Sequence, residues 1–114
     1  MQKDLRQRTK QFALRVIKMY IALPKTELAR VLGRQALRAG TSIGANYREA
    51  LRARSKAEFV SKTGDCLREV DETEYWLELL VDSEFVRSEK MIALLAETRE
   101  LIAIFTTINK RSKE

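Results

Sequence analysis

The sequence of 114 residues contains no histidine, one cysteine, one proline and four glycines. Without histidine, the chain lacks the most common general base and the imidazole ligands of bundle metal sites. Cys66 cannot form a disulfide within the chain, and we expect it to be a small core residue. The single proline favours long helices over many short strands. We therefore expect a non-enzymatic protein with no cofactor and no metal.

Long apolar runs are also missing. No stretch approaches the ~18 consecutive apolar residues that a membrane-spanning helix needs. The first residues, Met-Gln-Lys-Asp-Leu-Arg-Gln-Arg, lack the apolar core of an export signal. We therefore expect a cytoplasmic protein that does not contact a membrane. Hydrophobic residues make up 45% and charged residues 33%, which excludes a disordered chain and predicts a single domain over residues 1–114.

Positive charge is concentrated in the first half of the chain. Residues 1–62 carry 15 Lys and Arg against 4 Asp and Glu, whereas residues 63–84 carry one arginine against 8 acids. The net charge is +6. This asymmetry has two readings, which are a basic surface that binds a polyanion or complementary surfaces that join subunits.

Apolar residues recur at steps of three and four, which predicts amphipathic helices. Pro24 and Thr26 mark one boundary, because proline stops a helix interior and threonine is a good N-cap. Ser55 with Glu58 three residues later is a capping box that starts another helix. The predicted helices span about 4–22, 27–53, 56–82 and 89–110. Joined by short turns, they predict an all-α fold, an antiparallel up-down-up-down four-helix bundle.

The second half of the first predicted helix is apolar almost all round, and Ile17, Tyr20 and Ile21 widen its apolar stripe. A surface helix of a monomer usually has one apolar face. This helix is therefore either a central helix covered by its own bundle or a helix that also contacts another subunit.

Small residues line one face of the second predicted helix, at Ala29, Gly33, Ala36, Gly40 and Gly44. Each glycine costs about 1 kcal/mol relative to alanine inside a helix, so a compensating interaction is expected. Missing side chains let a neighbouring helix approach closely. That neighbour is either a helix of the same bundle or a second subunit, and the sequence leaves both readings open.

Another face of the same helix carries five arginines, which we call the arginine strip: Arg30, Arg34, Arg38, Arg48 and Arg52. Guanidinium groups four residues apart present forked donors at a spacing that a phosphate backbone can use. No aromatic platform for bases lies beside them. We predict binding by shape and charge, with little base-specific readout. The alternative is a solvated face, or one that pairs with the acids of the third predicted helix.

Three polar residues fall near the expected core face of the second helix, namely Gln35, Ser42 and Asn46. Buried amides without a partner cost on the order of 1–3 kcal/mol each. We therefore predict a structural polar core, in which these residues bond to polar groups of the third helix. The candidate partners are Glu72, Thr73 and Tyr75.

Two motifs carry a resemblance to a known family. The first is Gln35 with Arg38 to Ala50, the second is Glu72-Thr73-Glu74-Tyr75-Trp76-Leu77, and Ser55, Glu58, Phe59 and Leu67-Arg68-Glu69 lie between them. From about Phe12 to Ile108 the chain resembles the bacterial four helix bundle protein family. Its members are also called ribosomal RNA intervening-sequence proteins, because many are encoded inside inserts in large-subunit ribosomal RNA genes. The resemblance implies a four-helix bundle that assembles as a ring, a homopentamer. The accessory protein of diversity-generating retroelements shares this architecture and binds nucleic acid.

These observations favour a non-catalytic, homo-oligomeric helical-bundle protein that binds nucleic acid, structured RNA or DNA, through the arginine strip. Repetition of a weak surface on several subunits raises the affinity for one polyanion. The alternative is a protein-interaction scaffold that docks another protein and uses its charged surfaces for subunit assembly.

Overall fold

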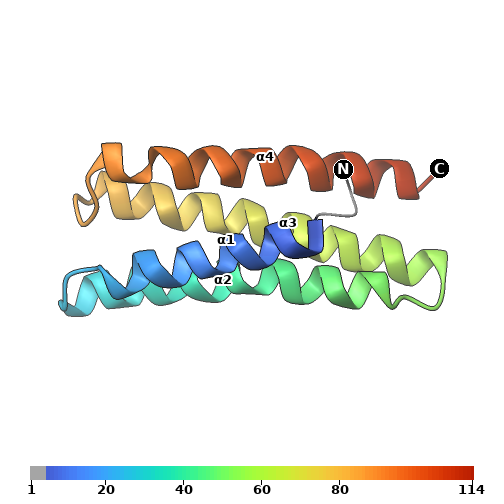
Figure 1. Ribbon diagram of the computed structural model, residues 1–114, viewed down its shortest axis with the longest axis horizontal. Helices are drawn as coiled ribbons and strands as arrows, with labels where there is room; N and C mark the ends of the chain where they lie inside the picture. Colours follow the sequence, from blue (N-terminus) through green and yellow to red (C-terminus); the bar gives the residue numbers. More distant parts are fainter. Residues whose placement is uncertain (1–4) are drawn as a thin grey trace.

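The computed structural model describes residues 5–114, which form four α-helices: α1 (Leu5–Ile21), α2 (Glu27–Leu51), α3 (Lys56–Asp82) and α4 (Ser88–Ser112). Consecutive helices run antiparallel and are joined by short turns, so the chain runs up, down, up and down (Figure 1). These residues contain no strand. The predicted all-α four-helix bundle is confirmed.

The helix boundaries follow the signals in the sequence closely. Thr26 caps α2, and its hydroxyl accepts a hydrogen bond from Ala29 N at 3.3 Å. Ser55 caps α3 by accepting from Glu58 N at 3.0 Å, while the Glu58 carboxylate accepts from Arg54 N at 2.9 Å. The structure corrects three helices, because α1 stops at residue 21 instead of 22, α2 stops at residue 51 instead of 53, and α4 covers 88–112 instead of 89–110. The first helix was expected to begin at residue 4, which lies outside the described residues.

Every helix contributes to one apolar core. Phe12 of α1, Ile43 of α2, Leu77 of α3 and Phe105 of α4 are almost completely buried. The Phe105 ring meets the Tyr47 ring edge to face, with 5.7 Å between their centroids. Burial of this apolar surface is the main source of stability for such a bundle.

The bundle is less tightly closed between its first and last helices than elsewhere. Successive helices pack along their lengths, whereas α1 and α4 contact each other little. Figure 1 shows α1 inclined to α4, so that the two helices diverge toward the end of α1. They are joined near the start of α1, where Arg8 donates to Glu97 at 2.7 and 2.8 Å and also to Glu100.

The polar groups of the core are mainly threonines that bond within their own helix. The hydroxyls of Thr63, Thr73 and Thr98 each donate to the carbonyl oxygen four residues earlier. Asn109 differs, because its Nδ2 donates to Val60 O and to Thr63 Oγ1, both at 2.9 Å. One buried amide therefore ties α4 to α3.

The predicted polar core is corrected by the structure. Tyr75, expected as a buried partner, is 56% exposed on the outside of α3. The Ser42 hydroxyl donates to a carbonyl of its own helix at 2.6 Å. Gln35 and Asn46 are half-buried, and no hydrogen bond joins their side chains to α3 within residues 5–114. Glu72 accepts instead from an arginine of α2. Because Gln35, Ser42 and Asn46 are only half-buried, water can hydrate their side chains.

Candidate nucleic-acid interface

The small residues of α2 pack against α1 of the same chain. A Cβ added at Gly40 would lie 2.9 and 3.0 Å from the two γ-carbons of Val16. At Gly33 an added Cβ would lie 2.5 Å from Leu23 Cδ1. Of the two readings of this seam, packing inside the bundle is therefore the one that the structure shows. With α1 on this face, another face of α2 is left to solvent.

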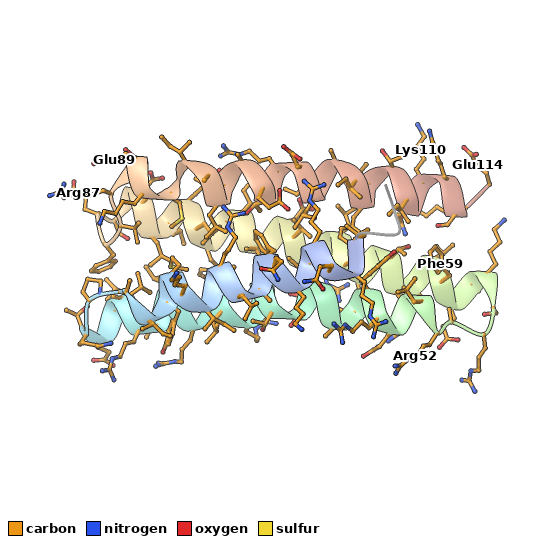
Figure 2. The ribbon with its side chains drawn as sticks, in the orientation of Figure 1. Arg52, Phe59, Arg87, Glu89, Lys110 and Glu114 are labelled. Carbon is orange, nitrogen blue, oxygen red and sulfur yellow. The ribbon has the colours of Figure 1, made fainter. Side chains whose placement is uncertain are left out.

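The arginine strip lies on that solvent-facing side. Its five side chains are all exposed: Arg30, Arg34, Arg38, Arg48 and Arg52. With the exception of Arg38, they make no ion pair with a carboxylate of residues 5–114. Figure 2 shows Arg52 extending away from the bundle. Most of the strip is therefore open to a polyanion.

Arg38 differs from the other arginines of the strip because it pairs with carboxylates of the neighbouring helix α3. Its Nη2 lies 3.2 Å from Glu72 Oε1, and its Nη1 lies 3.8 Å from Glu69 Oε1. The Glu69 side chain is only 12% exposed, and its Oε1 is buried with no hydrogen bond in the described chain. The Arg38 charge therefore stabilises a carboxylate that solvent barely reaches. Two pairs remain free of such contacts, Arg30 with Arg34 and Arg48 with Arg52.

These two arginine pairs are far apart along α2. Their midpoints are about 18 residues apart, which corresponds to about 27 Å at the helical rise of 1.5 Å per residue. At 3.4 Å per base pair, about 8 base pairs of DNA cover this distance. A short ligand therefore reaches one pair, whereas a longer duplex reaches both.

A shallow hollow of about 390 Å³ lies at the beginning of α2, between Lys25, Glu27, Arg30 and Arg34. Three of these four side chains are basic, and the start of a helix adds partial positive charge. Lys25 was missing from the predicted strip. Its position directly before the N-cap Thr26 is the signal that could have identified it, because the cap fixes where the first helical turn begins.

Most acids of α3 that face a neighbouring helix are paired within the chain. Arg99 of α4 lies 2.8 Å from Glu74 and 3.2 Å from Glu78, and the hydrogen bond that it donates to Glu74 raises the pKa of Arg99. A further ion pair joins α3 to α2, and here the base is on α3: Lys62 of α3 lies 2.6 Å from Glu49 of α2. The acids of α3 therefore form ion pairs with neighbouring helices of the bundle and do not only face solvent.

The surroundings of Cys66 make its thiol a poor nucleophile. Cys66 is fully buried with its sulfur 3.6 Å from Ile43 O, and burial raises the pKa of its thiol to about 12. The thiolate, which is the nucleophile, is therefore scarce. In the described part of the chain, no three His, Cys, Asp or Glu side chains lie where they could hold a metal ion. Among residues 5–114, no helix combines the length and apolar character needed to cross a membrane.

Comparison with known proteins identifies relatives of this chain. The family described as 23S rRNA-intervening sequence protein matches residues 1–107. A crystal structure from Bacteroides thetaiotaomicron VPI-5482, of a protein with unknown function from the S23 ribosomal protein family, is 37% identical with a TM-score of 0.89. The match covers 96% of this chain and 99% of that one. No curated protein matches the sequence.

Proposed function

The chain belongs to the 23S rRNA-intervening sequence protein family, and on this basis we propose that it is a non-catalytic, homo-oligomeric protein that binds nucleic acid. The observation that carries the proposal is the exposed arginine strip, most of which has no carboxylate partner within residues 5–114. Arginine suits this role because its planar fork donates two parallel hydrogen bonds to phosphate oxygens. The ligand we propose is structured RNA or duplex DNA, recognised without regard to base sequence.

A rigid duplex fits the spacing of the strip. The arginine pairs are held about 27 Å apart by one continuous helix, so a ligand that contacts both must itself extend over that distance. Four arginine–phosphate contacts on one subunit give an expected slope of log affinity against log salt of about −3.6 on DNA. Assembly would steepen this dependence, because several strips could then contact one polyanion.

An apolar ridge on α1 supports the homo-oligomeric part of the proposal. Leu14, Ile17 and Ile21 are 47%, 36% and 64% exposed, and their spacing puts them on one outward face. Contiguous exposed apolar surface commonly marks an interaction site. We propose that a second copy of the chain covers this ridge. A pentamer, which the family resemblance suggests, would have a mass of about 66 kDa from subunits of 13.2 kDa.

Fluorescence anisotropy with labelled RNA and DNA duplexes of about 20 base pairs tests the binding proposal, with salt varied between about 50 and 200 mM. The double variant Arg34→Gln/Arg48→Gln removes one charge from each pair and should flatten the DNA salt slope by about 1.8. The control Arg68→Gln/Arg111→Gln removes the same charge from α3 and α4 and should change the DNA salt slope much less. The proposal is wrong if neither duplex binds at low salt, or if both double variants weaken binding equally.

Sedimentation equilibrium tests the assembly separately. Ile17→Glu/Ile21→Glu should reduce the mass toward that of one chain, because two buried carboxylates would oppose an apolar interface. Ile92 provides the matched control, because it is as exposed as Ile21, at 64%, but lies on α4. Ile92→Glu should leave the mass unchanged. A wild-type mass of 13.2 kDa would contradict the assembly.

A further inference from the structure

A groove of about 720 Å³ lies between α1 and α4, beside the turn from α3 into α4. Its apolar floor is formed by Met19, Leu23, Phe85, Val86, Met91 and Leu94. Four basic side chains, Arg15, Lys18, Arg87 and Lys90, form its rim. None of the described residues that line it is acidic. The groove therefore combines an apolar base with positive charge on its edges.

The divergence of α1 and α4 creates this groove. Arg8 of α1 donates to Glu97 of α4 near the start of α1, whereas the residues that line the groove lie toward the other end of α1. The ribbons of α1 and α4 are farther apart at that end (Figure 1). Its walls are low at Ala22 and Ala93, which are short and exposed. The half-buried Met19, Phe85 and Val86 are consequently reachable from one open side, whereas Leu23, Met91 and Leu94 belong to the buried core.

The charge on the rim is largely uncompensated. Arg15, Lys18 and Lys90 make no ion pair with a carboxylate of residues 5–114. Arg87 lies 4.0 Å from Glu89, and both side chains are largely exposed, so this pair contributes little. An occupant of this groove should therefore carry negative charge beside apolar groups.

We infer that this groove docks a short, acidic, amphipathic helix of a partner protein. An amphipathic helix buries its apolar face in such a groove through residues spaced at i, i+3, i+4 and i+7. Residues 15–21 of α1 and 88–94 of α4 flank the groove, and their length of about 9 Å is a little under two helical turns. Glutamates beside the apolar face would then meet Lys18 and Lys90. Met19, which is half-buried, can adapt to different apolar side chains.

The floor and the open side favour a protein partner over other anions. A nucleic-acid backbone could contact the basic rim but would leave the accessible parts of Met19 and Phe85 without apolar partners. A small ligand is usually enclosed over most of its surface, whereas Ala22 and Ala93 leave this groove open. The inference concerns a surface other than the arginine strip and the ridge on α1, and it does not rest on the function proposed above.

The probe is a fluorescein-labelled synthetic peptide of leucine and glutamate, with the leucines at helical spacing. We expect it to bind the full chain and to shift the methyl NMR signals of Met19 and Met91. A scrambled peptide of the same composition and a peptide with lysine in place of glutamate should not bind. Lys18→Glu/Lys90→Glu should weaken binding at least about tenfold, which corresponds to about 1.4 kcal/mol.

The matched control is Lys56→Glu/Lys110→Glu, which makes the same charge change at the other end of the bundle, where Figure 2 shows Lys110. It should retain most of the affinity. Ala93→Gln adds bulk at the groove wall without changing charge and should also weaken binding. Circular dichroism checks that each variant keeps its helices.

Several results would overturn the inference. These are equal weakening by both charge-reversed variants, equal binding of the scrambled peptide, and unchanged binding to Ala93→Gln. Displacement of the peptide by duplex RNA would assign the groove to the nucleic-acid surface instead. A fall in the mass of the assembly for Lys18→Glu/Lys90→Glu would show that a second copy fills it. Shifts of the Met19 and Met91 signals with dodecanoate but not with the peptide would indicate an anionic amphiphile.

Discussion

Replacing Gly40 by alanine should destabilise the protein, whereas the same change at Gly64 should stabilise it. Both glycines lie inside long helices, and no glycine of residues 5–114 has a positive φ angle. Alanine is therefore compatible with the backbone at both positions. The difference between them lies in what an added methyl group would meet.

At Gly64 the added Cβ has one neighbour, Asn109 Nδ2 at 3.6 Å, which is an ordinary contact. The variant should gain about 1 kcal/mol from helix propensity. At Gly40 the Cβ meets three carbons of Val16 within 3.3 Å, and Val16 is fully buried with a stiff β-branched side chain. Overpacking costs about 1–3 kcal/mol. Because Gly40→Ala also gains about 1 kcal/mol from helix propensity, its free energy of unfolding should fall by roughly 0–2 kcal/mol in total.

Urea unfolding followed by circular dichroism measures both effects, with all proteins compared at one concentration because assembly would make stability concentration-dependent. The two variants should differ by about 1–3 kcal/mol in the free energy of unfolding. Thr9 lies 3.1 Å from a Cβ added at Gly44, so Gly44→Ala should fall between them. If Gly40→Ala were as stable as Gly64→Ala, the close packing of α1 on α2 would not explain the glycines.

Two further predictions use the same unfolding assay. Asn109→Ala should lower the free energy of unfolding, because the loss of its two interhelical hydrogen bonds costs about 1–3 kcal/mol. This cost exceeds the gain of about 0.7 kcal/mol from the higher helix propensity of alanine. An unchanged stability would mean that this amide does not tie α4 to α3. Glu84 has a φ angle of 66° at the end of α3, where glycine is favoured, so Glu84→Gly should stabilise the protein by about 0.5–1 kcal/mol. The adjacent control Ser83→Gly should destabilise it because Ser83 has a φ angle of −88°, and stabilisation by both changes would contradict the role of the backbone angle.

The fold could be predicted from the sequence because its signals are local. Thr26 and Ser55 cap the helices that they were expected to cap, and the apolar period gives the faces that pack. The exposure of Arg34 and Arg48 also follows from helical spacing, once the glycine seam is placed against a neighbour. Only the structure shows which neighbour covers the seam, because the sequence fits both a helix of the same chain and another subunit.

The features that could not be predicted depend on angles between helices. Arg38 lies four residues beyond Arg34, which rotates it by about 40° around α2. That rotation is enough to bring it to Glu72 of α3, although the two arginines look equivalent in the sequence. The groove between α1 and α4 likewise results from the inclination of α1, for which the sequence carries no local signal. Tyr75, by contrast, was misplaced although the sequence carried the signal, because it is two residues from both Thr73 and Leu77 and therefore lies about 160° around α3 from these buried residues.

The outward direction of the arginines depends on the residues behind them. Gly40 packs α2 against Val16, and about two helical turns further along α2 Tyr47 packs on Phe105. Insertion of a single residue between these contacts would rotate everything after it by about 100°. Tyr47 would then leave Phe105, and Arg48 would turn with it away from the line of Arg34. The core therefore fixes the backbone spacing of the two arginine pairs, so that binding of a polyanion of the kind proposed would cost the rotamer freedom of the arginine side chains, about 0.5–1.5 kcal/mol each, but little backbone freedom.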